Sequence, residues 1–278
     1  MRRFQFAQRV PGGRPLRILW WDVCRTLTCA ALRLLYRFRV RGLEHVPRRG
    51  PVLFISNHQS YLDPAIDSSI ARDRQFTAIA RESLFRFKPF GWLIRSIGAV
   101  PVAGDGNDAA AMRVALGELA AGRCILIYPE GTRSPDGRLQ EFQRGILLLQ
   151  RRAKVDVLPI GVDGGQDVWP RGRAAPLLRG RLAACAGPLI TAARLAELGP
   201  DEALELLESE VDRLRLEARA MIRASSGGRW PLPGPGDEPR VPRAIPESDA
   251  RRARRARAAA ASPGEAPAPA DDGGSGSA

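Results

Sequence analysis

Short apolar runs alternate with helix-like segments through the middle of the chain, and this alternation restricts the possible folds more than any other feature of the sequence. The first run, residues 52–55, lies between Gly50-Pro51 and Asn57 and is typical of a strand buried on both faces. Strands that alternate with helices build α/β domains. We therefore predict a mixed, largely parallel sheet flanked by helices. The expected strands are residues 52–55, 76–80, 98–102, 124–128, 155–162 and 181–186.

Helices are expected between these strands, at residues 64–72, 108–121 and 142–153. Residues 83–97 are rich in aromatic and aliphatic side chains. The stretch is apolar enough to be buried or to meet acyl chains. Such side chains lie in the core more often than at a ligand site, so core is the first interpretation. Pro159 stands inside an expected strand and cannot donate to a sheet ladder, which indicates a bulge or an edge strand.

Residues 16–38 are apolar but contain five charged residues, which argues against a membrane-spanning helix. A secretory signal is not expected either. Because apolar residues recur at steps of three and four and most charges lie opposite, we predict an amphipathic helix that associates with the membrane interface. Packing of this helix on the protein's own core is the alternative. The apolar face comprises Trp20, Val23, Leu27, Ala31, Leu34 and Phe38.

Changes in composition divide the chain into four parts. A basic arm and the amphipathic helix occupy residues 1–41, and the α/β domain, to which the chemistry is assigned, occupies residues 42–199. Residues 200–224 have apolar residues at helical spacing and are expected to form a second amphipathic helix. Residues 225–278 are rich in Pro, Ala and Arg, so we expect a disordered tail.

The composition limits the possible partners. The formal charge of +13 lies mostly outside the tail and suits an anionic membrane, a phosphorylated substrate or nucleic acid. The four cysteines form no CxxC pair, and His45 and His58 are the only histidines. A zinc site of ordinary His and Cys composition is therefore not expected, and no metal ligands are assigned.

The loop after the first strand carries His58 and Asp63. Histidine can accept a proton near neutrality because its unperturbed pKa is roughly 6.5. A carboxylate that accepts from one ring nitrogen fixes the tautomer that a general base needs. A strand, a turn and a helix that starts near Asp63-Pro64 would let Asp63 fold back toward His58. The alternative is that Asp63 only caps a helix while His58 is a polar loop residue.

A second loop, YPEGTRS at residues 128–134, follows another strand. Gly131 permits close backbone approach, and the planar guanidinium of Arg133 suits a pair of phosphate oxygens. Thr132 and Ser134 add hydroxyl donors. The alternative is a tight turn in which Glu130 and Arg133 pair with each other.

These segments together resemble the glycerolipid acyltransferase family. The likeness rests on NHQSYLD at residues 57–63, YPEGTRS at residues 128–134 and VLPIGV at residues 157–162, and it covers residues 40–200. It is strongest toward bacterial lysophosphatidate (1-acyl-sn-glycerol-3-phosphate) acyltransferases. The resemblance implies transfer of a fatty acyl group from acyl-CoA or acyl-carrier protein to the hydroxyl of lysophosphatidate. The product would be phosphatidic acid, and no cofactor is implied beyond the acyl thioester.

The resemblance also implies roles for individual residues and a location. His58 would be the general base and Asp63 would orient it. The acceptor-binding loop would consist of Glu130, Gly131, Thr132 and Arg133, with Arg133 on the phosphate. Arg81, at the end of the second strand, is assigned to the same phosphate. The enzyme would act at the cytoplasmic face of the cell membrane as a peripheral or monotopic protein.

One departure from the family leaves the acceptor open. An Arg commonly follows the family's second motif, here GAVPV, but this chain has Ala103-Gly104. An ornithine-lipid or another lyso-lipid acceptor is therefore an alternative. A non-catalytic basic protein that binds membranes or nucleic acid is the alternative of another class, although nucleic acid is not the expected partner.

Overall fold

The computed structural model describes residues 9–102, 108–243 and 245. Three sequence-based interpretations fall outside these residues. They are the substitution at Ala103-Gly104, the first part of the basic arm, and nearly all of the tail beyond residue 243. The expectation of disorder is wrong for residues 225–243, which are described and include a 3₁₀ helix at Pro235–Asp237.

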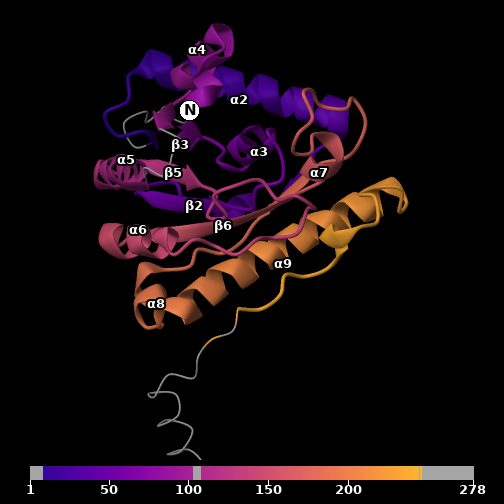
Figure 1. Cartoon of the computed structure of the whole chain (residues 1–278). Coiled ribbons are helices and arrows are strands. Elements are labelled where there is room, and N and C mark those ends of the chain that lie inside the picture. Colours follow the sequence, from indigo (N-terminus) through magenta and orange to yellow (C-terminus); the bar gives the residue numbers. More distant parts are fainter. Residues whose placement is uncertain (1–8, 103–107, 244, 246–278) are drawn as a thin grey trace, which may run out of the picture. The chain divides into compact units, whose positions relative to one another are not determined.

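Helices and strands alternate along the described chain (Figure 1). The strands are β1 (Arg39–Arg41), β2 (Val52–Ser56), β3 (Phe76–Arg81), β4 (Ala99–Val102), β5 (Cys124–Ile127), β6 (Asp156–Asp163) and β7 (Ala183–Ala186). The α-helices are α2 (Pro15–Tyr36), α3 (Asp63–Ile70), α4 (Lys88–Ser96), α5 (Asp108–Ala120), α6 (Gly145–Ala153), α7 (Gly165–Val168), α8 (Ala192–Ala196) and α9 (Pro200–Ser226). Short 3₁₀ helices are η1 (Leu43–His45), η2 (Glu82–Phe85) and η3 (Pro235–Asp237).

The described strands form one sheet in the order β1-β7-β6-β2-β5-β3-β4. Neighbouring strands are parallel except for β6 and β7. This confirms the predicted mixed, largely parallel α/β fold. Because β2, β5 and β6 point the same way, the loops that follow them leave the same edge of the sheet.

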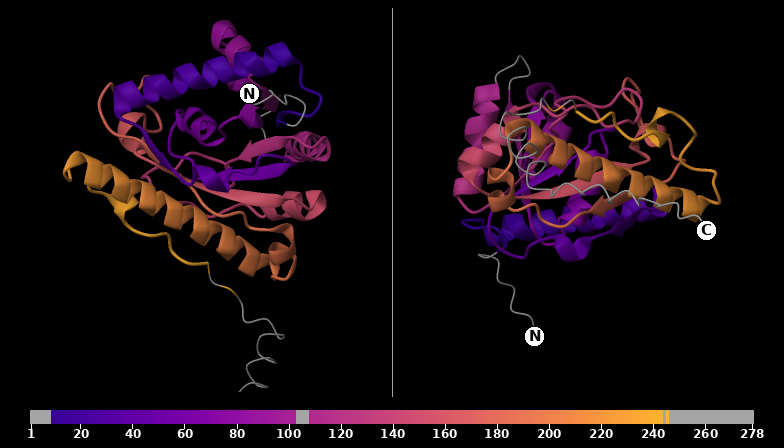
Figure 2. Two further views of the ribbon diagram at one scale, coloured as in Figure 1. Left: turned by 180° about the vertical axis from the view of Figure 1, so that it is seen from behind. Right: turned by 90° about the horizontal axis from the view of Figure 1, so that it is seen from below.

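Alternating side chains of β2 supply both halves of the core. Phe54 packs with Ile66 of α3 and Trp21 of α2 on one face. On the other face, Leu53 and Ile55 join apolar residues of α5, α6 and α9. Figure 2 shows from behind that the sheet separates α2 and α3 from α9. The central strand is therefore buried on both faces, as predicted.

The helix α9 lies directly on β6 because the strand carries Gly161 at the crossing. A Cβ at Gly161 would overlap the backbone of Leu214 and Arg215. Close approach of this kind requires glycine. The crossing brings the polar residues of α9 next to the end of β6.

Two expectations about the sheet and its core are wrong. The stretch at residues 83–97 is not core, because none of its large side chains is buried and several are exposed, with Phe87 70% and Trp92 65% accessible. Pro159 does not mark an edge, because β6 has a neighbour on each side. The carbonyl of Pro159 accepts from the backbone N–H of Gly187, the residue after the last one of β7. The N–H that proline lacks would therefore point to a position beyond the β6–β7 ladder, and no ladder hydrogen bond is lost.

The helix α2 has two apolar faces. Ile18, Trp21, Leu32 and Tyr36 are buried against the domain. Most of the stripe identified from the sequence faces outward instead, including Val23 at 42% exposure and Leu27 at 65%. Among the described helices, none combines the length and apolar character needed to cross a bilayer.

Candidate functional site

The side chains of His58 and Asp63 meet at the carboxyl end of β2. Asp63 is the first residue of α3 and is fully buried. Its Oδ2 accepts from His58 Nδ1 at 2.8 Å and from the backbone N–H groups of Gln59 and Ser60 at 2.6 and 2.7 Å. The positive end of the α3 dipole also favours a carboxylate there. Leu62, not Asp63, is the N-cap of this helix.

This contact determines which nitrogen of His58 can act as a base. A carboxylate accepts only, so Nδ1 carries the proton in the neutral ring and Nε2 is left as the acceptor. The His58 side chain is 20% exposed, whereas Asp63 is inaccessible. The arrangement can therefore remove a proton from a hydroxyl group that approaches Nε2.

Tyr128 packs against one face of the His58 imidazole ring. Its ring stacks on His58 with centroids 4.1 Å apart and an interplanar angle of 16°. The Tyr128 hydroxyl donates to Asp67 Oδ2 at 2.7 Å, and Ser56 donates to Asp67 Oδ1 at 3.1 Å. Burial raises the pKa of Asp67 well above its usual value, and the charge of Asp63 raises it further. Sequence reasoning missed both Tyr128 and Asp67.

Glu130 joins the two loops through its carboxyl group. Oε1 accepts from the backbone N–H of His58 at 2.6 Å, and Oε2 accepts from that of Gln140 at 2.9 Å. The backbone N–H of Ser134 in turn donates to the His58 carbonyl at 2.7 Å. Burial raises the Glu130 pKa to about 8. Both carboxyl oxygens are thus engaged within the protein, and no ion pair between Glu130 and Arg133 occurs among the described residues.

Arg133 lies over the exposed ring of Tyr61, with its Cζ 3.6 Å from the ring centroid. Its Nη1 is buried and has no hydrogen-bond partner among the described side chains and backbone. A buried guanidinium nitrogen usually has a partner, so this atom is available to an anion. Gly131 has a φ of +73° and lies against Gln143, while Thr132 is exposed.

Arg81 ends β3 and is exposed. The register pairs Ala78 of β3 with Leu126 of β5, so the end of β3 lies level with the start of the Glu130 loop. No hydrogen bond or ion pair in the described part of the chain ties the Arg81 side chain to the other candidate residues. The fold thus places Arg81 at the same sheet edge without joining it to the pair formed by His58 and Asp63.

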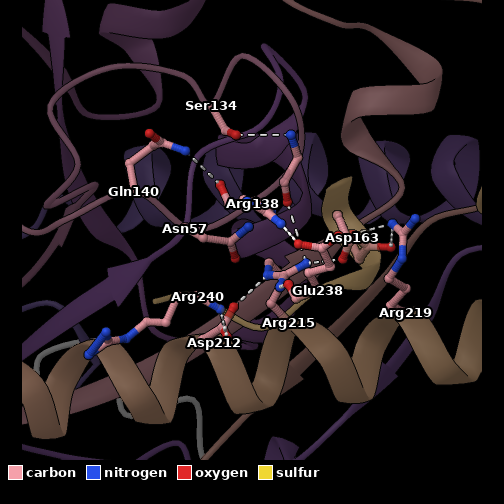
Figure 3. A network of polar contacts seen from close by, with 12 residues as sticks. Asn57, Ser134, Arg138, Gln140, Asp163, Asp212, Arg215, Arg219, Glu238 and Arg240 are labelled. Atoms are coloured by element: carbon pink, nitrogen blue, oxygen red, sulfur yellow. Dashed lines mark hydrogen bonds and ion pairs between the residues drawn. The ribbon is translucent and has the colours of Figure 1, made fainter. Parts of the chain in front are cut away.

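A buried polar network joins the two loops to the end of β6 and to α9 (Figure 3). Gln59 donates through Nε2 to the Gly137 carbonyl at 3.0 Å and to Asp163 at 3.1 Å. From α9, Arg219 pairs with Asp163 at 3.1 Å, and Arg215 donates to the same Gly137 carbonyl at 3.4 Å. This network therefore fixes the backbone that follows Arg133.

Arg215 also holds the segment that follows α9. It donates to the carbonyls of Gly236 and Glu238 at 2.6 and 2.9 Å and pairs with Asp212 at 2.7 Å. Arg138, in the second loop, pairs with Glu238. The sequence signal was limited to charged residues that border the apolar face of α9, at Glu208, Asp212, Arg215 and Arg219.

Comparisons with known proteins find similarity to acyltransferases. The family model described as Acyltransferase matches residues 37–163, which include both loops. A chloroplast 1-acyl-sn-glycerol-3-phosphate acyltransferase of Arabidopsis thaliana is 30% identical over 53% of this chain and 42% of the relative. A Pseudomonas aeruginosa protein with the same enzyme name is 32% identical over 49% of this chain and 52% of the relative.

A lyso-ornithine lipid O-acyltransferase of Pseudomonas aeruginosa is 29% identical over 60% of this chain and 63% of the relative. The chain thus spans less than two thirds of the length of these relatives. Among solved structures, the 1-acyl-sn-glycerophosphate acyltransferase of Thermotoga maritima superimposes with a TM-score of 0.64. The match covers 78% of this chain and 83% of that one at 22% identity, which identifies a shared fold.

Proposed function

We propose that this protein transfers a fatty acyl group from an acyl thioester to the hydroxyl of lysophosphatidate. The match of residues 37–163 to the Acyltransferase family model supports this proposal. The product is phosphatidic acid, used in phospholipid synthesis. The observation that carries this proposal is the partly exposed His58, fixed by Asp63. Relatives named 1-acyl-sn-glycerol-3-phosphate acyltransferase support the choice of acceptor.

The proposed reaction is a direct transfer. His58 Nε2 removes the proton from the acceptor hydroxyl while the oxygen attacks the thioester carbonyl, and the thiolate leaves with that proton. The carboxylate of Asp63 stabilises the imidazolium that forms transiently. General-base assistance of this kind contributes about 100- to 10,000-fold. The step requires an acyl-CoA or acyl-carrier protein donor and no further cofactor.

Arg133 is the proposed ligand of the acceptor phosphate. Its buried Nη1 lacks a partner among the described residues, and its position over Tyr61 fixes the guanidinium plane. A planar guanidinium can bind two phosphate oxygens at once. Gly131 and Thr132 would border this acceptor, and Arg81 would add long-range attraction from the end of β3. Glu130 would act by holding the backbone of the His58 loop.

A second acceptor is a lyso-ornithine lipid. It is favoured by the similarity to the lyso-ornithine lipid O-acyltransferase and by Ala103-Gly104, where an Arg is expected. An ornithine lipid lacks the phosphate that such an Arg would bind. The reaction at His58 would be the same with either acceptor.

The proposed location is the cytoplasmic face of a membrane, with α2 and α4 in the interface. Trp20 contacts Trp92 at a centroid distance of 6.2 Å and donates to Ser96 Oγ at 2.8 Å, which joins the two helices. Exposed tryptophan and leucine side chains with flanking arginines suit the headgroup region. This membrane surface comprises Leu16, Leu19, Trp20, Val23, Leu27, Phe87, Phe90, Trp92 and Leu93, all more than a third exposed.

The decisive experiment compares membranes that contain the wild type, His58→Ala or His45→Ala. Each sample receives labelled acyl-CoA or acyl-carrier protein and a panel of lyso-lipids, and mass spectrometry identifies the products. His45 is the other histidine of the chain and therefore gives a matched control. Phosphatidic acid formed by wild type and His45→Ala, but not by His58→Ala, is the expected result. A different His58-dependent product would reassign the acceptor, and no His58-dependent product would refute the enzymatic proposal.

A further inference from the structure

Four arginines converge where α2 ends and β1 begins. Arg37 follows α2, Arg39 opens β1, Arg181 precedes β7, and Arg229 follows α9. Backbone hydrogen bonds hold three of them together, because Leu182 donates to the Tyr36 carbonyl at 3.3 Å and Arg39 donates to the Leu182 carbonyl at 3.1 Å. We call these four residues the arginine cluster.

The cluster has no counter-charge. Among the described residues, none of the four arginines forms an ion pair with an acidic side chain, whereas their neighbour Arg41 pairs with Glu217. Burial lowers the pKa of Arg181, and the charges of Arg37, Arg229 and Arg39 lower it further. The Nε of Arg181 is buried without a hydrogen-bond partner in the described chain. Unpaired like charges and an unsatisfied buried donor are typical of an anion site.

The cluster lies at the same sheet edge as the candidate catalytic site. Because β7 runs opposite to β6 and β1 runs with β7, the amino ends of β1 and β7 lie beside the carboxyl ends of β6 and β2. In the strand order, β7 is two steps and β1 is three steps from β2. At about 4.8 Å per step, β7 and β1 lie roughly 10 to 14 Å to the side of β2, the strand that leads to His58.

Two glycines connect the cluster to the loop of Asp63. A Cβ at Gly164 would overlap the backbone oxygen of Arg181. A Cβ at Gly165 would come within 2.9 Å of Ser60 Cβ and 3.1 Å of Asp63 Oδ1. The backbone of Gly164 and Gly165 therefore lies between the backbone of Arg181 and the carboxylate of Asp63.

We propose that the arginine cluster binds the nucleotide phosphates of acyl-CoA while the thioester lies at His58. This inference rests on the proposed function and identifies its donor. The acceptor phosphate is assigned to Arg133, so the cluster is available to a second polyanion. Coenzyme A carries several phosphate charges at the far end of its pantetheine arm, which matches a group of cations set apart from the reacting atoms.

The test uses Arg39→Gln/Arg181→Gln in the full-length protein. Arg48→Gln/Arg49→Gln is the matched control, because it removes two exposed arginines that precede β2 at the opposite edge of the sheet. Each variant is assayed with acyl-CoA and with the corresponding acyl-pantetheine, which lacks the nucleotide phosphates. We expect the first variant to raise KM for acyl-CoA about tenfold or more, with little change in kcat or in KM for acyl-pantetheine. The control should match wild type with both donors.

Calorimetric binding of free CoA gives a readout that does not depend on turnover. If no acceptor is acylated, the proposed function fails, and CoA binding that is weakened only in the cluster variant still supports the site. Arg229→Gln, at an exposed position, repeats the test if the double variant unfolds. Equal changes with both donors, or results equal to those of the control, would overturn the proposal. So would weaker binding to anionic vesicles with unchanged CoA affinity, because the cluster would then contact lipid headgroups.

Discussion

The imidazole of His58 lies nearly parallel to the ring of Tyr128, at a centroid distance of 4.1 Å. The stack limits rotation of His58 about its side-chain bonds, while Asp63 holds the ring in its plane. It also places the negative face of an aromatic ring against the imidazolium that would form in the proposed proton transfer. A cation in this position is stabilised by about 0.5 to 2 kcal/mol.

We therefore expect Tyr128→Leu to lower kcat by about 3- to 30-fold with little change in KM. Tyr128→Phe keeps the ring and loses only the hydrogen bond to Asp67, so its kcat should stay within about threefold of wild type. Steady-state kinetics of the two variants decide the matter. Equal losses in both variants would show that the hydroxyl, not the stack, is what matters.

Asp63→Asn should have a larger effect on kcat than the loss of the Tyr128 ring. The amide preserves the size of the side chain, but it can present its NH₂ group to His58 Nδ1 and so stabilise the wrong tautomer. In comparable His–Asp pairs this change lowers kcat by as much as about 10⁴-fold. We expect a large fall in kcat with acceptor binding intact, measured by kinetics and by acceptor titration. A variant that retains wild-type kcat would exclude the proposed orienting role.

The alternation of apolar runs and helices predicted six of the seven described strands, because buried strands leave a clear pattern in the sequence. The short edge strand β1 was missed, since its two arginines are exposed and it has no apolar run. The five-residue spacing from His58 to Asp63 also indicated that a turn could bring the two together. The stack of Tyr128 on His58 was hidden because it joins residues far apart in sequence. Sequence alone cannot show that β2 and β5 are neighbours.

The burial of the arginines on α9 could not be predicted from the sequence either. Arg215 and Arg219 look like solvent-facing residues of an amphipathic helix until the chain after α9 folds back and covers them. The exposure of Phe87 and Trp92 was mispredicted for the opposite reason. Aromatic residues usually lie in the core, but here they stay exposed, and the proposed contact with lipid would remove the need to bury them.

Glu130 should make stability depend on pH. The unfolded chain loses this proton near the ordinary pKa of 4.5, whereas the folded protein keeps it until about pH 8. Between these values the folded state binds more protons, so the free energy of unfolding should fall as the pH rises. Denaturant unfolding from pH 5 to pH 9 should show this fall, and Glu130→Gln should reduce its slope.

Asp167 supplies the control for this pH dependence. Burial raises its pKa to about 6, so Asp167→Asn should alter the slope below pH 6 and leave the range from 6 to 8 unchanged. If the free energy of unfolding of Glu130→Gln fell with pH as steeply as that of the wild type between pH 6 and 8, Glu130 would not be the group responsible for the pH dependence.

Arg215 should be among the residues of α9 that are most important for stability. It is fully buried, and its loss would remove the donor to Asp212 Oδ1 and to the carbonyl of Gly236. Removing one partner of a buried ion pair costs about 3 to 5 kcal/mol. We expect Arg215→Leu to lower the free energy of unfolding by about that amount in denaturant titrations.

Arg213 on the same helix is the matched control. It pairs with Glu210 at 2.9 Å but is 51% exposed. Surface pairs contribute less than about 1 kcal/mol, so Arg213→Leu should unfold close to wild type. Similar free energies of unfolding for the two variants would show that the network beneath the second loop is not a stabilising element.

The membrane surface defined by α2 and α4 predicts a change in partitioning. Phe87→Ser/Trp92→Ser removes two of its most exposed side chains. Because each large apolar side chain that enters the interface contributes about 1 kcal/mol or more, vesicle binding should weaken about 10- to 100-fold. Leu148→Ser/Val241→Ser is the control, since these residues are 46% and 80% exposed on elements outside the membrane surface. Sedimentation with anionic vesicles measures both variants, and equal binding by the two would place the contact with lipid on another face of the domain.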